Sequence, residues 1–316
     1  MPRMLPVLLG GDANVYGMAR SFYETCGVRS LAVCRRALPA LLLALVLTVG
    51  ISAAVCRVSL KTTEYTAAVR GLTAPLRTVV LSDLHSREYG KDNAALLARV
   101  AQQQPDAIFC VGDFIDSDAA PEQLQRLYQL LRRLGEIAPV FFSPGNHEIA
   151  YMESHGSELL DAVAATGATV LYDRWVQTTL GGAAVRIGGS CGLFRDINRS
   201  AKLDYAMEET IGAADVPGIV LLHMPESLLL DDARERWTGQ VFLSGHTHGG
   251  VIRIPLIGGL VAPTQGLFPK YDQGKFTVDG RMTLIITSGL AGYACVPRVC
   301  NRPEVCVVDL IPEEGS

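Results

Sequence analysis

Residues that can bind metal follow several short apolar segments of the chain. The chain has six histidines, and five of them occupy such positions together with aspartate and asparagine residues. Because the C-terminal ends of strands in an open α/β sheet gather along one edge, side chains that follow different strands can meet there. Imidazole and carboxylate groups suit Zn, Fe, Mn or Ni. The segments are Ser82–His85, Gly112–Asp116, Pro144–Glu148, His223 and Gly245–His248.

The number of candidate ligands predicts two metal ions rather than one. Seven nitrogen and oxygen ligands are too many for a single ion that must also keep a water ligand, whereas two ions sharing a bridging carboxylate fit this number. Asp83 and His85, like His246 and His248, are two residues apart and lie on the same side of an extended chain. Each segment alone also fits an ordinary turn, so the prediction depends on the whole set. The sixth histidine, His155, is interpreted as an ordinary polar residue.

The segments between these polar residues predict an α/β fold. Strands and helices alternate from residue 77 onward, and residues 83–113 have the length of one βαβ unit, about 30 residues. The Gly181-Gly182 pair predicts an antiparallel turn within residues 169–188, so the sheet is expected to be mixed. Strands are predicted at residues 77–82, 107–111, 139–143, 218–222, 240–243, 282–287 and 304–310, and helices at residues 93–104, 121–134 and 157–165.

The N-terminal part of the chain contains an apolar segment that fits a membrane. Residues 37–56 carry no charge and are flanked by Arg36 and Arg57. A helix of about 20 residues spans a hydrocarbon core of about 30 Å. We therefore predict a transmembrane helix or signal anchor here and place the protein at the cell membrane as a single-pass protein. Arg35-Arg36 and the small residues 52–54 also fit an export signal that is cleaved, and the anchor and the cleaved signal both stay open.

Four regions are predicted along the chain. Residues 1–36 form a poorly defined leader, in which residues 5–9 and 28–33 read as strands around a helical pattern at 13–26. Residues 37–56 form the membrane helix, residues 57–76 a linker, and residues 77–316 the catalytic domain.

Composition excludes some classes of partner and site. The 28 basic and 32 acidic residues give a net charge of −4, and no run of like charge indicates nucleic acid binding. The eight cysteines contain no CxxC pair, which argues against a cysteine zinc site. Buried thiols are the favoured interpretation, and a disulfide between Cys295 and Cys300, or of either with Cys306, stays open for a domain outside the cytoplasm.

The ordered motifs resemble the calcineurin-like metallophosphoesterases over residues 77–310. The matching motifs are Asp83-x-His85, Gly112-Asp113-x-x-Asp116, Gly145-Asn146-His147-Glu148, His223 and Gly245-His246-x-His248. Residues 245–255 and 297–304 are similar to a bacterial branch with an N-terminal membrane or export segment. The chain departs from that branch at Gly188–Gly192, which puts substrate contacts near Cys191 in doubt. The resemblance implies a four-layer α/β/β/α sandwich around a mixed sheet core.

The resemblance also implies a role for each site residue. Asp83, His85 and His248 would hold one divalent metal ion; Asn146, His223 and His246 would hold the second; and Asp113 would bridge both. His147 would protonate or stabilise the leaving oxygen, and Asp116 would orient His147. Glu148 is expected to form structural hydrogen bonds.

These assignments predict a membrane-associated phosphoesterase that hydrolyses a phosphomonoester, phosphodiester or pyrophosphate by attack of a hydroxide shared by two metal ions (Mn, Fe, Zn or Ni). The membrane segment favours a lipid-linked or nucleotide-lipid substrate, such as a UDP-diacylglucosamine, and an extracytoplasmic catalytic domain. Arg253 and Arg298 are candidates for binding the substrate anion, with surface ion pairs as the alternative. A non-catalytic scaffold and an exported soluble phosphatase with a cleaved leader are the competing hypotheses. The oligomeric state stays open.

Overall fold

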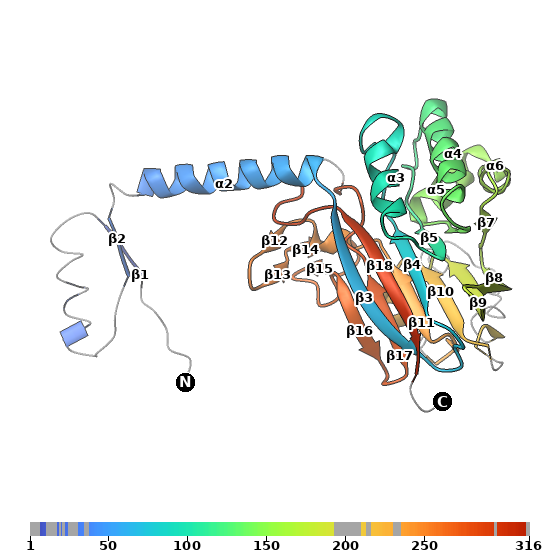
Figure 1. Ribbon diagram of the computed structural model, residues 1–316. Helices are drawn as coiled ribbons and strands as arrows, with labels where there is room; N and C mark the ends of the chain where they lie inside the picture. The colour runs from blue at the N-terminus through green and yellow to red at the C-terminus, as the bar shows by residue number, and fades with distance from the viewer. Residues whose placement is uncertain are drawn as a thin grey trace. The chain divides into compact units, whose positions relative to one another are not determined.

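The structure, a computed structural model, divides the chain into two compact units at residues 1–54 and 55–316 (Figure 1). It describes residues 7–10, 18, 20, 23–24, 31–34, 38–192, 210–212, 216–229, 235–293 and 296–313.

The first unit contains a small parallel strand pair followed by a long helix. The strands are β1 (Val7–Gly10) and β2 (Leu31–Cys34), close to the two strands predicted in the leader. The helical pattern predicted between them lies mostly outside the described residues. The helix α2 (Leu38–Val58) matches the predicted apolar segment, and its last residues belong to the second unit. Residues Pro39–Val58 are long and apolar enough to cross a membrane.

Two six-stranded mixed sheets form the body of the second unit (Figure 1). In spatial order, the first sheet contains β3 (Lys61–Val69), β18 (Glu304–Pro312), β4 (Leu76–Leu81), β5 (Ala107–Val111), β6 (Val140–Ser143) and β7 (Thr169–Val170). The second contains β16 (Gly274–Val278), β17 (Met282–Ile286), β11 (Val241–Ser244), β10 (Gly218–Leu222), β9 (Ala183–Ser190) and β8 (Arg174–Leu180). Strands β4 to β7 are mutually parallel, as are β9, β10, β11 and β17.

Alternating side chains of the strands bury both faces of the first sheet. Val79 and Leu81 of β4 pack in the cluster that contains the helices, whereas Val80 between them packs toward the second sheet. This follows from the period of two along a strand. Because both faces are covered, β5 has no exposed residue and reads as a continuous apolar run in the sequence.

The outer layers are helical and unequal. The first sheet is covered by α3 (Ala94–Ala101), which follows the short helix η1 (Lys91–Asn93), and by α4 (Pro121–Gly135) and α6 (Glu158–Ala164). Among the described residues, the outer face of the second sheet is covered by Ile211, Trp237 and the short helix α9 (Glu226–Leu229). This arrangement matches the predicted four-layer sandwich, with a thin last layer.

The segment that the sequence analysis treated as a linker contains a strand of the first sheet. Residues 61–69 form β3, which pairs in parallel with β18 along its whole length. The strand lies at the sheet edge and many of its side chains are at least partly exposed, so its sequence lacks the apolar run typical of the central strands. The other predicted domain boundaries stay predictions.

Three further parts of the fold differ from the prediction. The antiparallel hairpin predicted within residues 169–188 is present as β8 and β9, but residues 169–170 form β7 in the other sheet. The helix α5 (Asn146–His155) begins directly after the loop that follows β6. A run of short strands joins β11 to β16: η2 (His248–Gly250) is followed by β12 (Arg253–Ile254), β13 (Gly258–Gly259), β14 (Val261–Ala262) and β15 (Gly266–Leu267).

The cysteines in the core are thiols. Cys56, Cys110, Cys191 and Cys306 are buried and free. The disulfides that would involve Cys306 are therefore not formed, because this side chain packs between the sheets. Cys295 lies outside the described residues.

Candidate metal centre

The C-terminal ends of the central strands of both sheets meet at one site. The loops after β4 and β5 are joined by backbone hydrogen bonds, in which Asp83 donates to the carbonyl of Gly112 and His85 donates to the carbonyl of Asp113, both at 3.0 Å. The two sheets are joined there as well, because the backbone N–H of His246 donates to Asp83 Oδ1 at 3.0 Å. Hydrogen bonds therefore link the predicted polar loops of the two sheets to one another.

Among the described residues, three groups of side chains have ligand atoms within 4.8 Å of one another. Two of them contain only predicted ligands: Asp83, His85 and His248 form one, and Asp113, His223 and His246 form the other. The third group shares His85 with the first and adds Asp116 and His147. Asp113 lies between the two groups of predicted ligands, because its Oδ2 atom is 3.1 Å from His223 Nε2 and 3.9 Å from His85 Nε2.

The hydrogen bonding of the candidate ligand atoms shows whether these residues fit a metal. The Nε2 atoms of His85, His223 and His246 and the Oδ1 atom of Asn146 are buried and have no hydrogen-bond partner. Buried polar atoms are almost always partnered, and the three orphaned imidazole nitrogens belong to the two groups of predicted ligands, so they indicate a ligand. The residues present fit a metal centre.

The second nitrogens of three histidines fix the ring orientation. His223 Nδ1 lies 2.8 Å from the carbonyl oxygen of Val111, and His248 Nδ1 lies 3.3 Å from that of Ala291. His85 Nδ1 lies 2.8 Å from Asp116 Oδ1. Carbonyl and carboxylate oxygens only accept, so each Nδ1 carries a hydrogen, and Nε2 is the ring nitrogen left to bind a metal once it carries no hydrogen. Metal-binding histidines are commonly oriented in this way.

Burial and charge set the protonation of the site. Burial lowers the pKa of His246 to about 3 and that of His248 to about 4, so both rings are neutral, the form that binds metal. Burial also acts to lower the pKa of His223, but the Asp113 carboxylate outweighs it and raises that pKa to about 10. Burial acts to raise the pKa of Asp113, but His223 outweighs burial and lowers it. The attraction of Asp113 for a cation at this position also favours a metal.

The backbone of the ligand loops is strained. Asp83, His85, Asp113, His246 and His248 have φ angles between 45° and 67°, in the left-handed region that non-glycine residues rarely adopt. Strain of this kind costs about 1–3 kcal/mol per residue and clusters at functional sites. Five of the seven predicted ligands are in this conformation.

Close packing around Asp113 requires two glycines. A Cβ atom on Gly145 would lie 2.3 Å from Asp113 Oδ1, and one on Gly112 would lie 2.6 Å from His223 Nδ1. Gly112 also has a φ angle of 72°. The glycines in these two motifs therefore allow the loops to approach closely.

Glu148 holds two ligand loops together, which is the structural role expected from the sequence. Its carboxylate is fully buried and accepts hydrogen bonds from the backbone N–H groups of Asp113, Phe114, Ile115 and Gly145 at 2.7 to 3.2 Å. Burial followed by the nearby Asp113 charge raises the pKa of Glu148.

Asp116 lies closer to His85 than to His147, the residue that it was predicted to orient. Its Oδ1 atom lies 2.8 Å from His85 Nδ1 but 3.9 Å from His147 Nδ1. His147 Nδ1 instead accepts a hydrogen bond from the backbone N–H of Ser117 at 3.3 Å. Because the loop carrying Asp116 runs back toward the loop after β4, the carboxylate meets the metal-ligand candidate His85.

His147 lies at the open side of the site. Its ring contacts that of His85 with centroids 4.7 Å apart, and its side chain is about one-third exposed, at 30%. Since Nδ1 accepts a hydrogen bond from Ser117, the ring hydrogen is on Nε2.

Neither arginine proposed to bind the substrate anion is free in the structure. Arg298 is buried and donates to the backbone carbonyls of Ala291 and Ser288, which is a structural role. Arg253 is partly exposed and is paired with Asp272, with Nη1 2.7 Å from Oδ2. Arg253 also lines an open hollow of about 400 Å³ with Leu256, Ile257 and Cys300 among its walls.

Two residues near the site, Asn301 and Tyr293, were not predicted as site residues from the sequence. Asn301 is buried, and its Nδ2 donates to the carbonyls of His248 at 2.7 Å and Val251 at 3.0 Å, which shapes the loop of a candidate ligand. Tyr293 is exposed, and its ring centroid is 5.5 Å from that of His248. Asn301 could have been found from the sequence, because it belongs to the segment 297–304 that is similar to the bacterial branch. Tyr293 stands alone in the sequence and belongs to no such motif.

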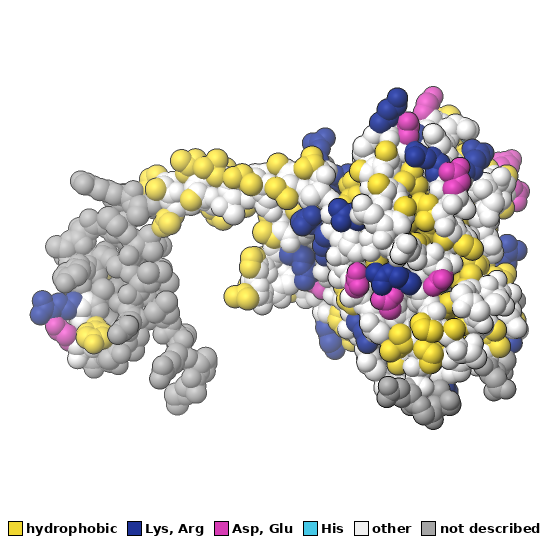
Figure 2. All heavy atoms as spheres, in the orientation of Figure 1, with side chains coloured by type: hydrophobic (Ala, Val, Ile, Leu, Met, Phe, Trp, Pro, Cys, Tyr) yellow, Lys and Arg dark blue, Asp and Glu magenta, His cyan; other side chains and the backbone are white. Residues whose placement is uncertain are grey.

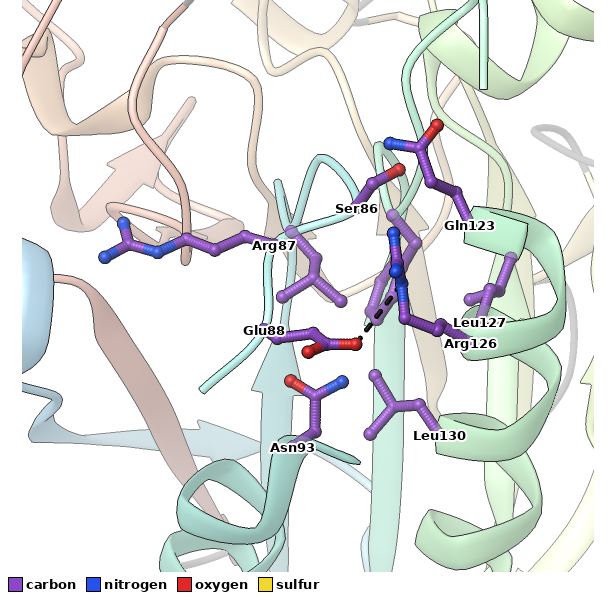
Figure 3. Close-up of a pocket in the computed structure, with 10 residues that line it drawn as sticks. Ser86, Arg87, Glu88, Asn93, Gln123, Arg126, Leu127 and Leu130 are labelled. Carbon is purple, nitrogen blue, oxygen red and sulfur yellow. Dashed lines mark ion pairs between the residues drawn. The ribbon is translucent and has the colours of Figure 1, made fainter. Parts of the chain in front are cut away.

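A small pocket lies beside the loop that follows His85. Figure 3 shows Ser86, Arg87, Glu88, Gln123 and Arg126 around it, with the dashed line marking the ion pair between Arg126 and Glu88, which is 3.2 Å long. Its volume of about 10 Å³ leaves room for about one water molecule. The pocket is too small to bind a substrate.

The position where the chain departs from the bacterial branch is buried. Cys191 packs with Ile149 and Met224, and burial raises the pKa of its thiol well above the usual value. This side chain has no exposed surface with which to contact a substrate.

The chain is similar to several known proteins. The chain is 27% identical over 241 residues to the phosphodiesterase YaeI of Escherichia coli, covering 75% of this chain and 83% of that protein. It is 25% identical over 287 residues to the UDP-2,3-diacylglucosamine pyrophosphatase LpxG of Chlamydia trachomatis, covering 75% and 84%. Among solved structures, the Haemophilus influenzae NAD nucleotidase aligns at 13% identity with a TM-score of 0.44, covering 68% of this chain and 45% of that one.

The family model named calcineurin-like phosphoesterase matches residues 76–250, more than half of the chain. The matched segment contains all seven candidate ligands together with His147. The chain belongs to the calcineurin-like phosphoesterases.

Proposed function

We propose that this chain is a membrane-anchored phosphoesterase whose metal centre holds two divalent ions. The observation that carries the proposal is the set of orphaned Nε2 and Oδ1 atoms that surround Asp113. Asp83, His85 and His248 would hold the first ion, and Asn146, His223 and His246 the second. Asp113 would lie between them, in agreement with the two ligand groups of the structure.

Two such ions, of Mn, Fe, Zn or Ni, would lower the pKa of a water and neutralise the oxygens of a phosphate group. The protein side chains would position them. Asp116 would hold the ring of His85, because its carboxylate accepts the Nδ1 hydrogen at 2.8 Å. Glu148 would keep the Asp113 loop in place.

His147 is proposed as the residue that donates a hydrogen to the leaving oxygen. Its backbone N–H donates to Asp113 Oδ1 at 2.9 Å, which places it at the centre, and its Nδ1 atom is occupied by Ser117. The Nε2 hydrogen is therefore the one available to a substrate. General acid catalysis of this kind contributes about 10²–10⁴-fold to rate.

The proposed substrate is a phosphodiester or pyrophosphate linked to a lipid. Two observations support it. The helix α2 is apolar over Pro39–Val58 and exposes large side chains along its length, as a helix in lipid does. A relative that aligns over most of its length is named a UDP-2,3-diacylglucosamine pyrophosphatase. The catalytic domain would lie on the extracytoplasmic side.

The test is Asp113→Ala in the full chain, with Asp118→Ala as the matched control because Asp118 is an exposed carboxylate nearby. Hydrolysis of an aryl phosphodiester is measured with Mn, Fe, Zn and Ni, together with bound metal. We expect Asp113→Ala to lose bound metal and to lose activity by at least about 10³-fold, while Asp118→Ala keeps both.

Full activity of Asp113→Ala would refute the mechanism. Bound metal without hydrolysis of any phosphoester by the parent protein would favour the non-catalytic scaffold. Asp113→Asn, which preserves the size of the side chain, checks that a loss of activity is not a loss of folding. The mass of the mature protein distinguishes the anchor from a cleaved export signal, because a chain cleaved near residues 52–54 lacks most of the apolar segment 37–56.

A further inference from the structure

Two turns next to the metal centre expose large apolar side chains. Leu256 and Ile257 lie between β12 and β13 and are 107% and 66% exposed. Leu267 and Phe268 lie at and after the end of β15 and are 70% and 59% exposed. We call these four residues the apolar tips. Figure 2 shows hydrophobic side chains protruding where β13 lies in Figure 1.

Two of the four apolar tips have a strained backbone. Leu256 and Phe268 have φ angles of 69° and 54°, a region that bulky residues rarely enter. Such strain costs about 1–3 kcal/mol, and it persists at positions that have a function. Glycine would relieve it, yet both positions carry a large apolar side chain that has little contact with the protein.

The apolar tips are directly connected to the metal centre. β13 and β14 pack against η2, which begins with the candidate ligand His248. The N–H of Leu260 donates to the carbonyl of Gly250 at 3.1 Å, and the N–H of Phe268 donates to the carbonyl of Leu260 at 2.8 Å. Whatever binds the apolar tips is therefore held close to the site.

The same region is connected to the end of the membrane helix. Two residues, Ser59 and Leu60, separate α2 from β3. Arg302 donates to Ser59 Oγ and to the carbonyl of Leu60, both at 3.0 Å. Three residues earlier, the carbonyl of Val299 accepts the N–H of Arg253 in β12 at 2.9 Å. Hydrogen bonds within the second unit thus connect these hairpins to Ser59 and Leu60, the residues that directly follow α2 in the chain.

Basic residues accompany the apolar tips. Arg57 and Arg302 are exposed at the helix end, and Arg87 donates to the backbone carbonyl of Arg57. Lys270 is exposed two residues after Phe268. Large apolar side chains with nearby cations are the pattern of a surface that lies in the interface of an anionic bilayer.

We propose that the apolar tips insert into the interface of the bilayer that holds α2, so that the metal centre faces phosphate groups at the level of the lipid headgroups. The inference rests on the membrane anchoring of the proposed function. A second copy of the chain fits this surface poorly, because four side chains offer far less than the roughly 1,200 Å² that a stable protein interface buries.

The test places a tryptophan at an apolar tip of the full chain, reconstituted in vesicles of phosphatidylcholine and phosphatidylglycerol with brominated acyl chains. Bromine quenches tryptophan only when the ring enters the bilayer. The variants are Phe268→Trp and, as the control, Ile311→Trp. Ile311 is also exposed, but it pairs with Ala68, which lies seven residues along β3 from Lys61 at the start of the strand, a distance of about 23 Å. The native Trp175 and Trp237 are common to both variants.

We expect brominated lipid to remove the additional emission of Phe268→Trp and to leave that of Ile311→Trp unchanged. The double variant Leu256→Ser with Phe268→Ser is expected to hydrolyse a vesicle-embedded phosphodiester more slowly than the parent, and a soluble one at the same rate.

Three outcomes separate the inference from the function on which it rests. Unquenched Phe268→Trp in protein that floats with the vesicles overturns the docking surface and leaves the phosphoesterase intact. Protein that does not float refutes the anchor and the docking surface together, while hydrolysis of the soluble substrate still reports the metal centre. The third outcome is a tryptophan that is shielded from water but not quenched by bromine, in a protein whose mass in detergent is twice that of one chain. This outcome assigns the surface to a second copy of the chain and overturns the proposal.

Discussion

The first sheet supplies two carboxylates, one amide and one imidazole among the candidate ligands, and the second sheet supplies three imidazoles. Side chains also hold the loops in different ways. In the first sheet, the buried carboxylate of Glu148 accepts backbone N–H groups. In the second, the buried side chain of Asn301 donates to backbone carbonyls. The loops of the first sheet, here called the first edge, therefore concentrate negative charge and also carry His147. The loops of the second sheet, the second edge, present only imidazoles, of which His246 and His248 are neutral. We infer that the first edge performs the chemistry and the second mainly holds metal.

His147→Gln is expected to have the largest effect that separates the chemical role of the first edge from the metal-holding role of the second. Loss of the leaving-group donor is expected to lower kcat by about 10²–10⁴-fold without loss of bound metal. His246→Gln on the second edge is expected to lose metal as well as activity. Steady-state hydrolysis of an aryl phosphodiester and metal analysis of the same samples measure both. His155→Gln is the control, and an unchanged kcat in His147→Gln would contradict the division.

Asp116→Asn sharpens the comparison within the first edge. Because Asp116 contacts His85, we expect metal affinity to fall by about 10–100-fold, with activity restored by excess metal. If Asp116 acted through His147 instead, kcat would fall at saturating metal and affinity would stay the same. Metal titration monitored by activity separates the two outcomes.

The two loop-holding residues are expected to differ in their effect on stability. Glu148→Gln places an amide donor against backbone N–H groups in a fully buried position, and we expect a cost of about 3 kcal/mol or more. Asn301→Ala leaves the carbonyls of His248 and Val251 without this donor, at a cost of about 1–3 kcal/mol. Chemical denaturation measures both, with Glu153→Gln on the exposed side of α5 as the control. Equal effects of all three variants would contradict the assignment.

A further expected effect is a pH dependence of the stability of the metal-free protein. The pKa values of His246 and His248 are about 3 and 4 in the folded state, below the ordinary value near 6.5. Between these values the unfolded chain binds protons that the folded chain does not. The free energy of unfolding should therefore fall as pH decreases from 6.5 toward 4, by about 1.4 kcal/mol per pH unit for each group.

Denaturant midpoints after chelation, at pH 7 and pH 5, measure this dependence. His246→Asn is expected to have a shallower pH dependence than the parent, and His155→Asn the same dependence as the parent. His223 acts in the opposite direction, because its raised pKa of about 10 gives a contribution that is lost only as pH rises toward 10. A parent and a His246→Asn variant with equal slopes would contradict the prediction.

The sequence predicted the strands that end at the site because their apolar runs and polar ends are local patterns. Val111 ends a buried run and Asp113 follows it, and both features are visible without knowledge of the fold. The edge strand β3 was not predicted, because an exposed edge needs no apolar pattern. The partner of Asp116 was not predictable either, since His85 and His147 are both near it and a distance of 2.8 Å rather than 3.9 Å depends on the loop geometry.

The arginines also show that long-range contacts cannot be predicted from the local sequence. Arg298 looks like an anion-binding residue in the sequence, because a guanidinium is usually exposed. In the structure its burial lowers its pKa to about 10, and its donors meet backbone carbonyls. Long-range packing decides this role, and a single residue type carries no sign of it.

The edge strand β3 determines where the enzyme can be cut to obtain a soluble form. A version that began at residue 77 would remove β3 and uncover β18, whose residues are mostly buried. An uncovered apolar edge pairs readily with another chain, so such a protein should aggregate. A version that begins at Ser59 keeps β3 beside β18 and removes the apolar helix, so it is expected to avoid this aggregation.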